Sequence, residues 1–173
     1  MSLVLYAALV LATGVERLVE LVVSARNARW SLARGGRESG RGHFPAMVAL
    51  HTGLLVACVA EAALADRPFL PWLGWPALAV VLASQGLRWW CIAVLGPRWN
   101  TRVIVVPGLP LVRRGPYRVL AHPNYVAVVA EGVALPLVHT AWVTALTFTA
   151  LNAVLLLRFR IPAEERALAT LAG

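Results

Sequence analysis

Apolar residues are gathered in five long runs along the chain, separated by shorter polar segments. The runs cover Ser2–Ser24, Ala46–Ala65, Trp72–Leu95, a shorter stretch from Pro123 to near Val138, and Ala141 to about Phe159. A membrane-spanning helix needs about 20 predominantly apolar residues. The pattern therefore predicts an all-α integral membrane protein with about five transmembrane helices.

The segments between these runs predict a single membrane domain over residues 1–173. Residues 1–95 would hold three spans, and residues 96–173 a loop, a C-terminal helical hairpin and a final short segment. His139-Thr140 is too short a link for anything but a tight hairpin. Pro and Gly interrupt the loop Gly96–Ala121, which excludes one continuous helix. Irregular backbone near a membrane is covered by protein or lines a cavity, so we expect a cofactor cavity there.

The composition supports a membrane protein. Hydrophobic residues make up 60% of the chain and charged residues 14%, whereas soluble domains have about 45–50% and roughly 25%. The mean hydropathy is +0.72. A soluble enzyme, a secreted disulfide scaffold and a disordered chain are excluded. Cys58 and Cys91 lie inside apolar runs and predict neither a metal site nor a disulfide framework. The first run lacks a basic flank and a cleavage site, so we expect a retained span.

The basic residues are all arginines, and their distribution predicts the orientation. With five spans, thirteen of the 16 fall on one side of the membrane: Arg26, Arg29, Arg34, Arg37, Arg41, Arg98, Arg102, Arg113, Arg114, Arg118, Arg158, Arg160 and Arg166. The positive-inside rule makes that side cytoplasmic and places the N-terminus outside. This placement explains the net charge of +8 better than a nucleic-acid partner would. Arginine without lysine is typical of a high-GC bacterium, so we expect a bacterial inner membrane protein.

Ionisable residues inside spans are costly and usually functional. Arg88 needs an anionic partner, either Glu131 or a substrate anion. His51 could accept a proton, because its ordinary pKa is near 6.5; the alternative is a hydrogen-bonded packing residue. The other charged residues in the spans have simpler structural interpretations. Glu16, Arg17 and Glu20 in the first run could form a local ion pair, and Glu61 in the second run could have a structural role.

Two motifs flank the predicted hairpin. Gly115–Tyr125 reads GPYRVLAHPNY, and Arg160–Leu168 reads RIPAEERAL. In order, spacing and membrane context they resemble the isoprenylcysteine carboxyl methyltransferase (ICMT) family and its bacterial relatives. The resemblance covers roughly Leu95 to Leu168, and Ala121 stands where that family usually has arginine.

The resemblance implies an integral-membrane methyltransferase that uses S-adenosylmethionine in a cytoplasmic pocket. The cofactor-binding residues carried over come from the loop, the His-Pro block and the Glu-Glu block: Pro107, Gly108, Leu109, Tyr117, His122, Pro123, Tyr125, Arg160, Glu164 and Glu165. A metal is not expected. The residues agree with this picture, since Pro123 suits the first position of a helix whose free N–H groups could bind a carboxylate. Acidic residues after Pro162 would also suit a helix start without any ligand.

The acceptor implied by the resemblance is a lipophilic small molecule that enters from the bilayer. A carboxylate acceptor needs an arginine to orient it, and a phenol, with a pKa near 10, needs a base. The catalytic candidates are therefore the groups that could orient the acceptor or take its proton: His51, Arg88, Asn100, Arg102 and Glu131. We favour O-methylation of a phenolic or polyketide lipid, or of an isoprenoid or fatty acid.

Two other function classes fit the same residues. Some membrane reductases that use NADPH share a block similar to His122-Pro123-Asn124-Tyr125. In a small transporter or complex subunit, the charges in the spans would form an ion path. Cofactor preference separates the reductase from the methyltransferase, and little effect of changing Glu165 would favour the non-enzymatic protein.

Overall fold

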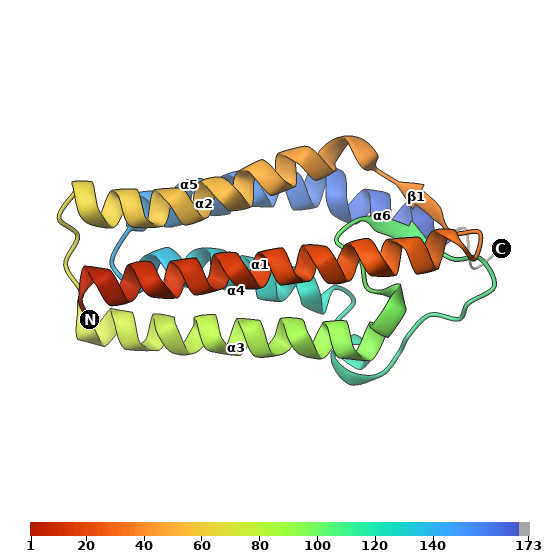
Figure 1. Ribbon diagram of the computed structural model, residues 1–173, viewed down its shortest axis with the longest axis horizontal. Helices are drawn as coiled ribbons and strands as arrows, with labels where there is room; N and C mark the ends of the chain where they lie inside the picture. Colours follow the sequence, from red (N-terminus) through yellow and green to blue (C-terminus); the bar gives the residue numbers. More distant parts are fainter. Residues whose placement is uncertain (170–173) are drawn as a thin grey trace.

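The computed structural model describes residues 1–169, and most of them are helical. Figure 1 shows α1 to α5 lying along the long axis of the molecule, with α2 beside α5 and α3 beside α4. The helices are α1 (Leu3–Leu32), α2 (Phe44–Leu64), α3 (Pro71–Leu95), α4 (Pro123–Leu137), α5 (Trp142–Leu155) and α6 (Ile161–Ala169).

Three of these helical stretches are long and apolar enough to cross a membrane: Arg41–Leu64, Pro71–Arg98 and Trp142–Ala169. The other two predicted spans differ in kind. Helix α1 has 30 residues but carries Glu16, Arg17 and Glu20 in its middle. Helix α4 has 15 residues, which at about 1.5 Å per residue gives roughly 22 Å, less than the ~30 Å hydrocarbon core of a bilayer. Five spans therefore stay a prediction, with three supported by length and composition.

The first helix continues past its predicted end at Ser24 to Leu32, so Arg26 and Arg29 belong to the helix and not to the loop. Ser2 begins it by accepting a hydrogen bond from the Leu5 N–H, at 3.3 Å. Prolines occupy the first turns of α2, α3 and α4, where a missing N–H costs nothing.

The end of the molecule that holds the C-terminus also contains the short elements (Figure 1). Two strands, β1 (Arg37–Ser39) and β2 (Val103–Val105), pair antiparallel with Arg37 opposite Val105. Three helical turns are η1 (Arg41–His43), η2 (Gly96–Arg98) and η3 (Gly115–Arg118). The all-α prediction was wrong in this detail, because β-branched residues of the irregular loop pair with a segment far away in sequence.

The predicted hairpin is confirmed, with α4 ending at Leu137 and α5 beginning at Trp142. The two helices approach closely at Gly132, where a Cβ atom would lie 2.1 Å from the Phe148 ring. Glu61 of α2 holds the start of α5, because its carboxylate accepts hydrogen bonds from the backbone N–H groups of Val143 and Thr144.

The apolar core lies toward the N-terminal end of the bundle. Tyr6, Leu54, Val81, Leu135 and Phe148 are among its buried members. Cys58 and Cys91 are both buried and free, as expected for thiols that pack as small apolar groups. The polar and catalytic candidates lie beyond this core, toward the end with the short elements.

Candidate functional site

A cavity of about 470 Å³ lies between α1, α2, α4 and the end of α5. Its apolar walls include Leu11, Val15 and Leu18 of α1, which are also exposed on the outside of the helix. The cavity therefore opens onto the apolar surface of α1. Its polar lining residues come from seven elements and the loop after η2: Arg17, Glu20, His43, His51, Thr52, Arg88, Thr101, Asn124, Tyr125, Asn152 and Arg160.

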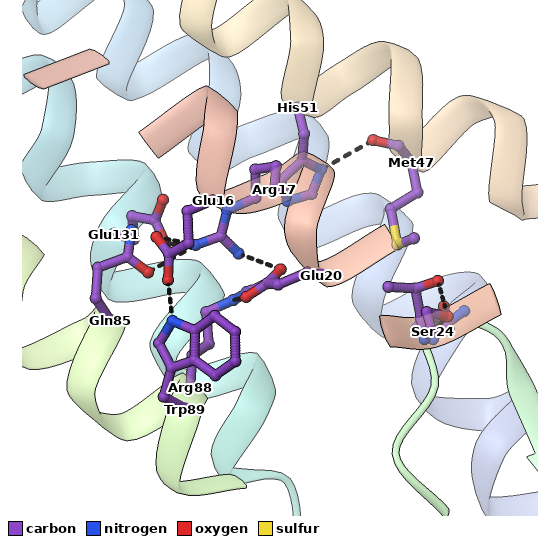
Figure 2. A network of polar contacts seen from close by, with 12 residues as sticks. Glu16, Arg17, Glu20, Ser24, Met47, His51, Gln85, Arg88, Trp89 and Glu131 are labelled. Atoms are coloured by element: carbon purple, nitrogen blue, oxygen red, sulfur yellow. Dashed lines mark hydrogen bonds and ion pairs between the residues drawn. The ribbon is translucent and has the colours of Figure 1, made fainter. Parts of the chain in front are cut away.

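A buried network of charges forms one wall of this cavity (Figure 2). Glu20 accepts two hydrogen bonds from Arg88, at 2.7 Å and 2.6 Å, and one from Arg17 at 2.8 Å. Arg17 also donates to Glu131 at 3.0 Å, and it lies 3.4 Å from Glu16. We call these five residues the charge cluster. Gln85 accepts a further bond from Arg17, and Trp89 donates to Glu16.

The charge cluster corrects one expectation and extends another. The sequence suggested Glu131 or a substrate anion as the partner of Arg88, whereas the structure pairs Arg88 with Glu20. The local pair of Arg17 and Glu20 is confirmed, but it belongs to a network that joins α1, α3 and α4. Arg88 and Glu20 line the cavity, whereas Glu131 lies behind Arg17.

His51 lies on α2 and faces the same cavity. Its Nδ1 lies 2.8 Å from the carbonyl oxygen of Met47, one turn earlier. A carbonyl can only accept, so Nδ1 carries a proton and, in the neutral ring, Nε2 keeps its lone pair. The ring also meets Phe148 edge to face, with 5.4 Å between centroids.

The two motif blocks meet at the end of the cavity. The Tyr125 hydroxyl donates a hydrogen bond to Glu164, and Arg160 Nε donates to the same hydroxyl at 3.1 Å. Arg160 also donates to the backbone carbonyl of Thr101. The His122 ring nitrogens lie 3.7 Å from Glu164 and 3.7 Å from Glu165. These contacts join residues that are 35 to 59 positions apart in sequence.

The local backbone explains how Arg160 reaches this place. Pro162 has no N–H to offer the carbonyl of Arg158, so the regular helical ladder is broken there. The chain instead forms a π-helical turn over Leu156–Arg160 before α6 begins. Such turns occur mostly as single insertions and frequently at functional sites. Arg160 is buried in this turn and lines the cavity.

The acidic pair is divided into two environments. The Glu164 side chain is 30% exposed and is held by Tyr125, whereas that of Glu165 is 64% exposed and lies 3.7 Å from His122. Glu164, followed by Glu165, raises the pKa of His122 above its ordinary value against the opposing effect of burial. Glu165 is thus the carboxylate with free acceptor capacity, and Glu164 positions Tyr125 and His122.

The donor set fits S-adenosylmethionine. A free carboxylate at Glu165 suits ribose hydroxyl or amino groups. The N-cap residue of α4, His122, makes no capping bond with its side chain, which leaves the start of the helix available to a carboxylate. Asn124, in the first turn of α4, has a buried amide oxygen without a hydrogen-bond partner.

Several predicted site residues do not line the cavity. Arg102 lies 3.6 Å from Glu38 of β1 and above the Phe44 ring. Asn100 donates to its neighbour Arg98 and is half-buried. Tyr117 lies against Cys91 of α3, and burial together with that thiol raises the pKa of its hydroxyl. Three residues sit in the turn after β2, outside the cavity lining: Pro107, Gly108 and Leu109. Within residues 1–169, no group of three or more His, Cys, Asp or Glu side chains lies close enough together to hold a metal ion.

Sequence reasoning missed several lining residues, among them His43 and Thr101. His43 lies 3.5 Å from Arg160 through its Nε2, and Thr101 accepts from Ser24 or donates to it at 2.8 Å. Neither belongs to the two motif blocks or to an apolar run, although Thr101 stands between Asn100 and Arg102, which the sequence did single out. Their role depends on which segments the fold brings to the end of the cavity.

Comparisons with known proteins agree with this arrangement. The model of the isoprenylcysteine carboxyl methyltransferase (ICMT) family matches residues 77–170. The chain is 39% identical over 155 residues to the uncharacterized protein YpbQ of Bacillus subtilis (strain 168), covering 89% of this chain and 90% of that relative. No solved structure gives a significant match.

The family match includes α4, the π-helical turn and both motif blocks, which are the parts that meet at the end of the cavity. It does not include α1 and α2, which supply the other walls and His51. With more than half of its length matched and the two blocks in contact, the chain belongs to the isoprenylcysteine carboxyl methyltransferase family.

Proposed function

We propose that this protein is an S-adenosylmethionine-dependent methyltransferase that O-methylates a lipophilic acceptor reaching the site from the bilayer. The observation that carries the proposal is the contact between the His-Pro block and the Arg…Glu-Glu block at one end of the cavity, through Tyr125, Arg160 and Glu164. Family membership favours the same reaction.

The residues divide into a cofactor part and an acceptor part. Glu165, His122 and the start of α4 at Pro123 would hold the cofactor, with Tyr125, Arg160 and Glu164 fixing their positions. S-adenosylmethionine, when bound, supplies a methyl group activated on a sulfonium sulfur. The protein's contribution is to align the acceptor with that group and to exclude water.

The shape of the cavity supports a lipophilic acceptor. Its walls are largely apolar, and Leu11, Val15 and Leu18 line it while facing the surface of α1 that a bilayer would cover. An apolar chain could thus enter sideways and place its polar end near His51 and Tyr125. A phenolic or polyketide lipid, or an isoprenoid or fatty acid, has this form.

The proposed setting is a bacterial inner membrane with five spans, the N-terminus outside and the site on the cytoplasmic side. The elements that carry most arginines lie at the end with the short elements (Figure 1), which supports this orientation. An impermeant maleimide should label Ala65→Cys in intact cells and Arg113→Cys only after permeabilisation. Labelling of Arg113→Cys in intact cells would reverse the orientation.

Cofactor binding tests the function. The purified protein in detergent should bind S-adenosylmethionine and S-adenosylhomocysteine in the micromolar range, measured by titration calorimetry, and should not bind NADPH. Preferential binding of NADPH would favour a membrane reductase. A folded protein that binds none of the three would overturn the proposal and favour a transporter or subunit.

A further inference from the structure

The cavity contains groups that discriminate between acceptor classes. We propose that the acceptor is a lipophilic phenol or enol, not a carboxylic acid, and that His51 accepts its hydroxyl proton through Nε2. This inference rests on the proposed methyltransferase function and specifies its acceptor and its base. It is carried by the charge cluster, by the hydrogen bonding of His51 and by an unpartnered amide in the cavity.

Both cations of the charge cluster already bond to carboxylates, although the Arg17 Nε donor is buried without a hydrogen-bond partner. Both bonds that Arg88 makes go to Glu20, and Arg17 bonds to Glu20, Glu131 and Gln85. The cluster holds three carboxylates and two guanidinium groups, a formal excess of one negative charge. A carboxylate acceptor would have to displace one of these carboxylates and leave it buried without a partner, which is strongly unfavourable. A neutral hydroxyl group requires no such exchange.

Arg160, the remaining arginine of the cavity lining, is also committed. Its donors reach the Tyr125 hydroxyl, the Thr101 carbonyl and, at 3.5 Å, His43. Through Tyr125 it is linked to Glu164, which belongs to the cofactor part of the site. The cavity therefore provides no unpartnered cation, within residues 1–169, for the head group of an acid.

His51 has the form of a base ready to accept a proton. The bond from Nδ1 to the Met47 carbonyl fixes the tautomer, so the lone pair is on Nε2. Across the described residues, Nε2 makes no hydrogen bond, although the side chain lines the cavity. The charged groups that act on the ring are Arg17 and Glu20 from α1 and Arg88 from α3, whereas α5 offers it the apolar ring of Phe148.

Asn152 marks where an oxygen-bearing head group would lie. It is 2% exposed and lines the cavity from α5, and its amide oxygen has no hydrogen-bond partner within residues 1–169. A buried amide oxygen without a partner is costly. A hydroxylated ring would satisfy it, while a plain hydrocarbon would not.

The reaction balances with this base. The acceptor exchanges its hydroxyl proton for the methyl group: the O–H pair forms the new O–CH₃ bond, the C–S pair stays on sulfur, and the proton goes to His51 Nε2. His51 then returns the proton to water. A phenol needs this help because its pKa is near 10, whereas a carboxylic acid is ionised already.

The test uses two probes that differ only in the reacting group, 4-decylphenol and 4-decylbenzoic acid. With purified protein in nanodiscs, transfer of labelled methyl from S-adenosylmethionine should favour the phenol by at least about tenfold. His51→Asn keeps a donor for the Met47 carbonyl and removes the base, so methylation of the phenol should fall by about 10²–10⁴. Val56→Ala, a change at an exposed residue of the same helix that does not line the cavity, should keep the rate.

A spectroscopic readout does not depend on turnover. 4-Decyl-2-nitrophenol absorbs differently as phenol and as phenolate. Bound to the protein with S-adenosylhomocysteine, it should show the phenolate band in wild type and in Val56→Ala, and the phenol band in His51→Asn. Calorimetric binding of S-adenosylhomocysteine checks that each variant is folded.

The outcomes separate the two proposals. Failure to bind S-adenosylhomocysteine would contradict the proposed function. Bound S-adenosylhomocysteine together with faster methylation of 4-decylbenzoic acid, or a nitrophenol that stays un-ionised in wild type, would overturn the inference about the acceptor and leave the methyltransferase standing. If His51→Asn fails to fold, the preference between the two probes and the wild-type spectrum still decide.

Discussion

Arg88 of α3 and Glu20 of α1 are joined by two hydrogen bonds, 2.7 Å and 2.6 Å long, between residues 68 positions apart. Both side chains are buried, and Arg17 completes the contact by bonding to Glu20 and Glu131. The pair fixes α1 against α3 next to the cavity, together with the bonds from Arg17 to Gln85 and from Trp89 to Glu16. Its charges therefore serve the shape of the site as well as its electrostatics.

Removing one partner of this pair should be more harmful than removing both. Arg88→Met or Glu20→Gln alone should destabilise the protein by about 3–5 kcal/mol, because a buried charge loses its partner. The double variant should recover part of that loss. Thermal unfolding in detergent, followed by fluorescence, measures the difference, and an additive effect of the two changes would contradict the pairing.

The acidic residues of α6 should separate cofactor binding from stability. Glu165→Gln should weaken binding of S-adenosylhomocysteine by about 10- to 100-fold, the value of a hydrogen bond to a charged group. Its melting temperature should stay unchanged, because the side chain is 64% exposed. Glu164→Gln should lower both affinity and melting temperature, since a neutral amide oxygen accepts the bond from Tyr125 more weakly and no longer attracts His122. Equal effects of the two variants in calorimetry and in melting would refute this division.

The contribution of His122 to stability should depend on pH. Its pKa is raised by Glu164 and Glu165, so the protonated ring is favoured in the folded protein. The stabilisation is fully present below the ordinary histidine value of about 6.5 and disappears as the pH rises through the raised pKa. His122→Asn should therefore lower the melting temperature of the ligand-free protein more at pH 6 than at pH 9. The side chain is one-fifth exposed, and we expect it to contribute about 1 kcal/mol or less to the free energy of unfolding. A difference in melting temperature between wild type and His122→Asn that grows toward pH 9 would be inconsistent with the pairing.

Much of the site could be predicted because its local signals are strong. Pro123 at a helix start, the two-residue link at His139-Thr140 and the spacing of the two motif blocks are all readable in one sequence. They led to the hairpin and to the residues that meet at Tyr125, Arg160 and Glu164.

The rest depends on contacts between distant segments. Any of three glutamates could have neutralised Arg88, and only the packing of α1 against α3 selects Glu20. The strand pair β1–β2 joins two three-residue segments with no repeating pattern. The π-helical turn follows from Pro162, but the same proline could equally have ended the helix.

The central claim is that the chain transfers a methyl group to a lipid. The most direct measurement incubates the purified protein in nanodiscs with S-adenosylmethionine labelled in the methyl group and with 4-decylphenol, and counts the label that enters the organic phase. Time-dependent labelling that stops in Glu165→Gln and persists in Asp66→Asn, a control at the opposite end of the bundle, is the predicted result. A folded protein that binds S-adenosylhomocysteine yet labels neither 4-decylphenol, 4-decylbenzoic acid nor any lipid of a bacterial membrane extract would contradict it.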